Sequence, residues 1–63
     1  MSWYDYHRSK VIGAKDEPFY ALIMAAMRKA DPNNLDKLKS VFPLTWAELE
    51  ERYKAPNGVL SYE

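Results

Sequence analysis

Residues 19–27 read Phe-Tyr-Ala-Leu-Ile-Met-Ala-Ala-Met, a run of nine residues without a charged side chain. A helix formed by this run is apolar on every side, whereas a helix at the surface of a small domain normally keeps one polar face. The run is too short to cross a bilayer, which requires about 20 apolar residues. It therefore predicts a central helix surrounded by other protein, and we expect no membrane association.

Signals for helix ends divide the sequence before and within this run. Ser2 and Asp5 have the spacing of a capping box, and the helix that they start is expected to fade near Gly13. The acidic pair at residues 16–17 precedes Pro18, and this order is typical of a helix start because proline suits the first turn. We therefore expect one helix before the apolar run and a second helix that contains it.

Similar signals predict two further helices in the second half of the chain. Asp31 is followed by proline, which predicts a capped third helix, and Pro43 is expected to end it. Thr45 and Glu48 have the spacing of a second capping box and predict the start of a short fourth helix. Residues 55–63 are then expected to form a turn and a tail.

These patterns together define the expected fold class. Apolar and polar residues nowhere alternate over a length that would suit a half-buried strand. A chain of 63 residues without cysteine is one domain of marginal stability. The sequence thus predicts an all-α protein, a compact bundle of three or four short helices over residues 1–63 with the apolar second helix at its centre.

The residues that usually carry out catalysis are sparse in this sequence. His7 is the single histidine, no serine lies in a Gly-x-Ser-x-Gly context, and the acidic pairs are adjacent residues that do not face each other on a helix. The two glycines are isolated, so no phosphate-binding loop can be assembled. We therefore expect no enzyme, no cofactor and no metal site. The absence of an export signal before the apolar run favours a cytoplasmic protein.

A protein interface is the function that the apolar run favours. If one face of the second helix meets the chain's own core, its remaining apolar residues are free to meet another chain or a second copy. The fourth helix carries aromatic residues that suit an interface equally well. The residues expected in such an interface are Tyr20, Met24, Met27, Trp46 and Tyr53.

The N-terminal segment leaves three interpretations open: packing within the chain, contact with another protein, and a nucleotide or nucleic-acid site. Its aromatic and basic residues could stack on a base and hold a phosphate, which predicts the last of these. That site would use Trp3, Tyr6, Arg8 and Lys10. The interpretation that we favour is packing, because Trp3, Tyr4, His7 and Val11 lie on one side of the helix at helical spacing. The formal net charge of +0 also gives nucleic acid no general attraction to the chain.

A longer pattern surrounds the apolar run. The residues from Pro18 to Asp31, followed by Asn34-Leu35, Leu38, Phe42-Pro43, Trp46, Glu48-Leu49, Arg52-Tyr53 and Ala55-Pro56, resemble a group of small proteins of unknown function encoded in bacterial and phage or prophage genomes. The resemblance covers residues 3–58. It implies a bacterial or phage-infected cytoplasm and, by analogy of size and setting, action by binding to a host or assembly protein.

Overall fold

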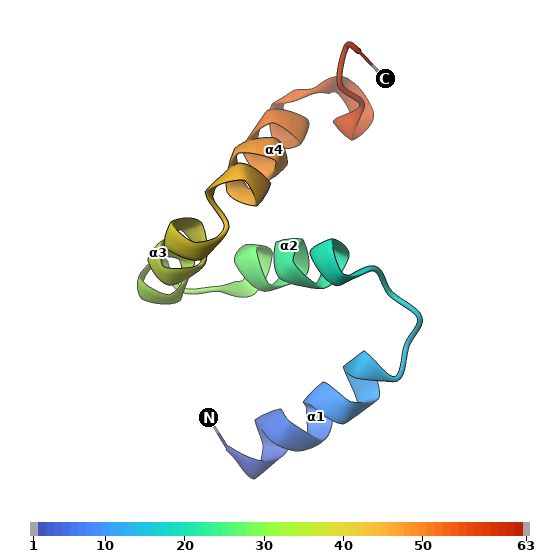
Figure 1. Ribbon diagram of the computed structural model, residues 1–63, viewed down its shortest axis with the longest axis vertical. Helices are drawn as coiled ribbons and strands as arrows, with labels where there is room; N and C mark the ends of the chain where they lie inside the picture. The colour runs from blue at the N-terminus through green and yellow to red at the C-terminus, as the bar shows by residue number, and fades with distance from the viewer. Residues whose placement is uncertain (1, 63) are drawn as a thin grey trace.

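Helices make up most of the chain. The computed structural model describes residues 2–62, which form helices without a strand in that range. The elements are α1 (Trp3–Gly13), α2 (Phe19–Lys29), α3 (Pro32–Val41), α4 (Pro43–Lys54) and the 3-10 helix η1 (Pro56–Gly58). The predicted all-α fold of short helices is confirmed (Figure 1).

Two helix starts follow from local side-chain chemistry as the sequence predicts. The Ser2 hydroxyl accepts a hydrogen bond from the N–H of Asp5 at 3.1 Å, and the Asp5 carboxylate accepts one from the N–H of Ser2 at 3.1 Å. Asp31 accepts a hydrogen bond from the N–H of Asn34 at 3.0 Å, with a proline in the first helical turn. Both carboxylates satisfy N–H groups that have no partner within the helix.

The predicted starts of the other two helices are displaced. Pro18 itself occupies the N-cap position of α2, so neither residue of the acidic pair 16–17 caps that helix. The capping box predicted at Thr45 is wrong, because α4 begins at Pro43 and Thr45 already lies inside it. Proline favours the first turn of a helix. Pro43 therefore ends α3 and begins α4 within one residue, before Thr45 is reached.

The core lies between the last three helices and the C-terminal segment. Helix α4 contacts α2, α3 and η1. The buried hydrophobic residues are Met27 from α2, Leu49 from α4 and Leu60, which are 3%, 8% and 3% exposed. The second helix is therefore half-buried along one side only, with Leu22, Ile23 and Met24 partly covered.

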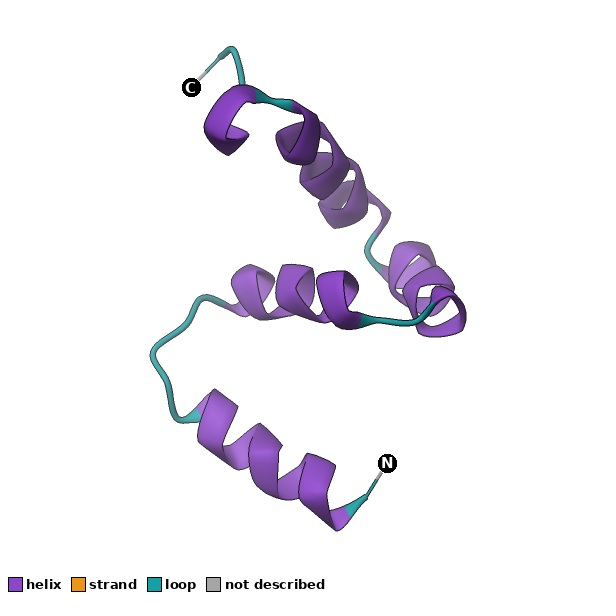
Figure 2. Cartoon of the chain, turned by 180° about the vertical axis from the view of Figure 1, so that it is seen from behind, coloured by secondary structure: helices purple, strands orange, loops and turns teal. Residues whose placement is uncertain are grey.

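Helix α1 does not join this core. Every residue of α1 is exposed, and Figure 2 shows the helix set apart from α2 and connected to it by the loop at residues 14–18. The packing interpretation of the N-terminal segment is thus wrong for the single chain, since Trp3 is 74% exposed. The radius of gyration is 13.5 Å, whereas a compact domain of this length has about 11 Å. The arrangement is more open than the predicted compact bundle because α1 stays outside it.

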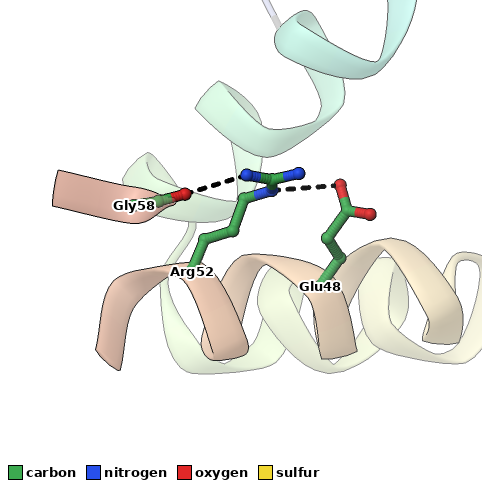
Figure 3. Close-up of polar contacts among 3 residues, drawn as sticks. All are labelled: Glu48, Arg52 and Gly58. Atoms are coloured by element: carbon green, nitrogen blue, oxygen red, sulfur yellow. Dashed lines mark hydrogen bonds and ion pairs between the residues drawn. The ribbon is translucent and has the colours of Figure 1, made fainter. Parts of the chain in front are cut away.

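The C-terminal segment folds back onto α4. Asn57 and Gly58 have φ angles of 55° and 72°, and this left-handed pair reverses the chain after η1. The guanidinium of Arg52 donates a hydrogen bond to the Gly58 carbonyl at 2.8 Å and lies 3.5 Å from Glu48 (Figure 3). These contacts bring Leu60 into the core, so the predicted tail is wrong at that residue. Glu63, at the end of the predicted tail, lies outside the described residues.

Candidate functional site

A groove with a largely apolar lining lies between α2 and α4. Its volume is about 450 Å³. The residues that line it are Met27, Arg28, Trp46, Leu49, Glu50, Tyr53 and Lys54. Two come from the last turns of α2 and five from α4, so the crossing of these helices creates the groove. We refer to this set of residues as the α2–α4 groove.

Helical spacing explains how these residues come together. Trp46, Glu50 and Lys54 are four residues apart, which places them in one row along α4. Leu49 and Tyr53 form a neighbouring row on the same helix. Met27 and Leu49 are buried and form the floor of the groove. Both rows of α4 therefore line the groove.

Aromatic rings form the walls of the groove. Tyr53 is 81% exposed, so the described residues leave most of its side chain uncovered. Trp46 is half-buried, and the ammonium group of Lys39 lies 4.6 Å from the centre of the indole ring. A cation over an aromatic face is attracted to it and holds the ring in place. The groove thus has one fixed wall and one uncovered wall.

Charged side chains surround the apolar lining. Arg28 and Lys54 supply two positive charges and Glu50 supplies one negative charge, and all three residues are exposed. Exposed charges at the edge of an apolar patch are the usual anatomy of a protein interface, with an apolar centre and a polar rim. The arrangement suits a binding partner that has an apolar face flanked by charges of both signs.

The structure brings together three of the five predicted interface residues. Met27, Trp46 and Tyr53 all line the α2–α4 groove, although Met27 belongs to the floor and is covered within the chain. Met24 lines an adjoining hollow of about 470 Å³ that also contacts the C-terminal turn. Tyr20 lies apart from the groove, where its ring is 6.5 Å from that of Phe42 in an edge-to-face arrangement.

The charged rim was missed by the sequence analysis. Arg28 directly follows Met27, and Glu50 and Lys54 continue the spacing of Trp46 by four residues. The four-residue spacing could have identified Glu50 and Lys54 as rim residues, but only if it were known that this side of α4 faces the end of α2.

The predicted nucleotide-site residues on α1 fall on two different sides of the helix. Trp3 stacks on His7 with ring centres 5.0 Å apart, and the Lys10 ammonium lies 5.8 Å from the centre of the Tyr6 ring. These residues are three or four positions apart and share one side. Arg8 is two positions from Lys10 and therefore points away from that side. The structure thus separates Arg8 from the other three.

Two other features were looked for among the described residues: a metal-binding group and a membrane-spanning helix. Across residues 2–62, no three His, Asp or Glu side chains gather into a group that could hold a metal ion. No helix in the same range is long and apolar enough to span a membrane. Comparison of the chain with protein-family models, curated proteins and solved structures found no match.

Proposed function

We propose that this protein is a non-catalytic protein-binding module that associates with a second copy of itself. The observation that carries the proposal is the amount of surface left uncovered. The chain exposes 5462 Å², whereas a compact monomer of 7.4 kDa exposes about 4,200 Å². The excess is about 1,250 Å² per chain, and a standard protein interface covers about 800 Å² per partner. One interface would therefore be enough to bring the exposed area to the usual value.

The uncovered surface also contains the residue types that are common in protein interfaces. Trp3, Tyr4 and Tyr6 are exposed on α1, and Tyr53 is exposed beside the α2–α4 groove. Tryptophan and tyrosine are enriched where proteins bind one another, because each covers a large area with few rotatable bonds. An aromatic surface of this extent favours a protein partner over water. A second copy of the chain is a partner that is available wherever the chain itself is present.

The cellular setting belongs to the same proposal. The resemblance of residues 3–58 to proteins from bacterial and phage genomes supports action in the cytoplasm of a bacterium or an infected host cell. A host or assembly protein is the other partner that this setting suggests. It would meet the same apolar surface as a second copy.

Sedimentation velocity tests self-association. We expect wild-type protein to be a dimer at high micromolar concentration. Tyr53→Glu should raise the dissociation constant at least about thirty-fold, because it places a charge in an apolar contact. Tyr62→Glu is the matched control, since Tyr62 is a similarly exposed tyrosine outside the groove. A wild-type monomer at high micromolar concentration would contradict the proposal.

A nucleotide- or nucleic-acid-binding site on α1 is the second candidate. It is favoured by the exposed stack of Trp3 on His7, which offers a flat aromatic face with Lys10 on the same side of the helix. Titration with a fluorescent single-stranded oligonucleotide at about 50 and 200 mM salt distinguishes the candidates, because phosphate contacts weaken steeply with salt. Binding that is salt-sensitive and lost in Lys10→Gln would favour this second candidate.

A further inference from the structure

We propose that α1 is the segment that occupies the α2–α4 groove, and that it does so in a second copy of the chain. Two copies would exchange their first helices, so that each groove receives α1 of the other copy. The inference rests on the proposed self-association and specifies its geometry. It assigns a ligand to the groove and a function to the exposed N-terminal helix.

The first argument concerns the stability of α1. It is a helix of 11 residues with no buried residue. An isolated helix shorter than about 12–15 residues is marginal in water even with a favourable sequence, so helices of this length are normally stabilised by packing. The capping box of Ser2 and Asp5 fixes where α1 begins, but it supplies no packing. A surface that covers α1 is therefore needed to hold it helical.

The second argument is the match between the two surfaces. Trp3, His7 and Val11 are spaced by four residues and form a row along α1, in which Trp3 and Val11 are apolar and the His7 ring stacks on the indole of Trp3. The groove offers a buried apolar floor, Met27 and Leu49, to receive such a row. Helix α1 is about 16 Å long, and the row from Trp46 to Lys54 spans about 12 Å, by the helical rise per residue. The lengths are therefore compatible.

One charge of α1 also has a counterpart on the groove. Helix α1 carries Asp5 near its start and two positive charges, Arg8 and Lys10, nearer its end. The rim of the groove carries Arg28 and Lys54 as positive groups and Glu50 as a negative group. Lys10 lies on the side of α1 that carries Trp3 and has Glu50 as a group of opposite sign, whereas the Asp5 carboxylate lies on another side and bonds to Ser2 in the capping box. Paired charges at an interface fix the orientation of the partner more than they add affinity.

The connection at residues 14–18 favours a second copy over the chain's own groove. It joins α1 to the start of α2, whereas the groove lies at the other end of α2, where Met27 and Arg28 are located. Helix α2 lies between α1 and α4 in Figure 1 and in Figure 2. Five residues span at most about 17 Å, and this length must pass around α2. In a two-fold dimer, each groove receives α1 from the other copy, so the connection within one chain does not have to pass around α2.

The exchange would cover both surfaces that the single chain leaves exposed. Docking covers α1 and the groove of the same chain at the same time, so both uncovered surfaces contribute to the excess of about 1,250 Å² over a compact monomer. An interface through the groove alone would leave α1 exposed. Reciprocal exchange covers α1 and the α2–α4 groove of each chain together.

Sedimentation of a matched pair of variants tests the inference. Val11→Lys places a charge in the row of α1 that carries Trp3, and Ser9→Lys places the same charge on the opposite side of that helix. Both residues are exposed in the single chain, so circular dichroism at low concentration should show equal folding. We expect Val11→Lys to weaken the dimer about thirty-fold or more and Ser9→Lys to leave it unchanged.

Disulfide formation identifies which copy supplies the helix. The chain contains no cysteine, so Val11→Cys protein mixed with Tyr53→Cys protein can form only the bonds that these two residues allow. We expect the mixed disulfide to exceed both self-disulfides, and a Ser9→Cys control to form little of it. A double variant that closes an internal disulfide instead would overturn the exchange. A wild-type dimer that tolerates Val11→Lys would overturn the exchange but leave self-association standing, whereas a monomeric wild type would remove the proposed function itself.

Discussion

Single side chains fix the start of α3 and the C-terminal side of the core. Asp31 satisfies a free N–H group at the start of α3, and Leu60 covers the core from the C-terminal side. Between them, Arg52 holds the Gly58 carbonyl and thereby keeps the left-handed turn against α4. Few residues are buried in this chain, so each of these contacts supplies a large share of its stability.

Removal of the cap at Asp31 should lower stability measurably. Asp31→Ala leaves the N–H of Asn34 without its acceptor, and we expect a loss of about 1 kcal/mol. In a domain of this size that loss lowers the melting temperature by roughly 4–8 °C. Thermal unfolding followed by circular dichroism measures it. Thr45→Ala is the comparison, because Thr45 is no cap in the structure and should cost less. Equal losses for the two variants would contradict the assigned helix starts.

Truncation of Leu60 tests the folded-back C-terminus. Leu60→Ala removes buried side-chain atoms and should cost about 2–5 kcal/mol, enough to unfold much of a marginal domain. Val59 is its neighbour and is exposed, so Val59→Ala should change the stability by less than about 0.5 kcal/mol. Urea unfolding of the two variants compares them directly. Similar midpoints would mean that residues 59–62 do not pack against α4.

At the scale of elements, the four helices differ in what holds them. Helix α4 contacts α2, α3 and η1, whereas α1 has an N-terminal cap and no buried residue. Local stability follows buried contacts, so the helices are expected to open at different free energies. The central element of the fold is therefore α4, whereas the sequence predicted that the helix containing the apolar run, α2, would be central.

Hydrogen exchange should separate α1 from the other helices in dilute solution. We expect the amides of α1 to exchange fastest and those of α4 slowest, because only α4 is packed on several sides. Raising the protein concentration into the range of the dimer should slow the exchange of α1 strongly. Exchange of α1 that is already slow in the monomer would show that the helix is covered within its own chain.

At the scale of the whole molecule, the exposed aromatic surface should govern association. An apolar interface weakens on cooling, because its driving force near room temperature is almost entirely entropic. We expect the dissociation constant of the dimer to be lower at 25 °C than at 5 °C. The same constant should change little between about 0.1 and 1 M sodium chloride. Calorimetric dilution at several temperatures measures both, with a negative heat-capacity change as the marker. A dimer that dissociates at high salt would instead be held by charges.

Sequence patterns locate helix ends better than they locate the core. Ser2, Asp5 and Asp31 act on residues three positions away, so their effects are local and predictable. Burial depends on how helices cross. The pattern of α2 predicted Met27 on a free side, yet the crossing with α4 makes it the most covered residue of that helix. Leu60 follows a turn and has no periodic neighbours, so no local pattern could assign it to the core.

The groove was predictable in its residues but not in its shape. Trp46 and Tyr53 were expected at an interface because aromatic residues on a short helix exceed what one chain can cover. Their meeting with Met27 depends on the angle between α2 and α4, which the sequence does not encode locally. The separation of α1 was unpredictable for the same reason, since the helical spacing of its large side chains favoured packing in the core but would be the same at an interface.

The connection at residues 14–18 also gives the chain a defined point of cleavage. Lys15 is exposed and lies outside any helix, where proteases that cut after lysine act most readily. One cut there would release α1 as a peptide and leave a chain that keeps its groove but has no helix to donate. Such a chain could accept a helix without returning one. Under the proposed exchange, the cut form would take the helix of one intact chain and return none, so a small dose of it would interfere with dimer formation by the intact protein.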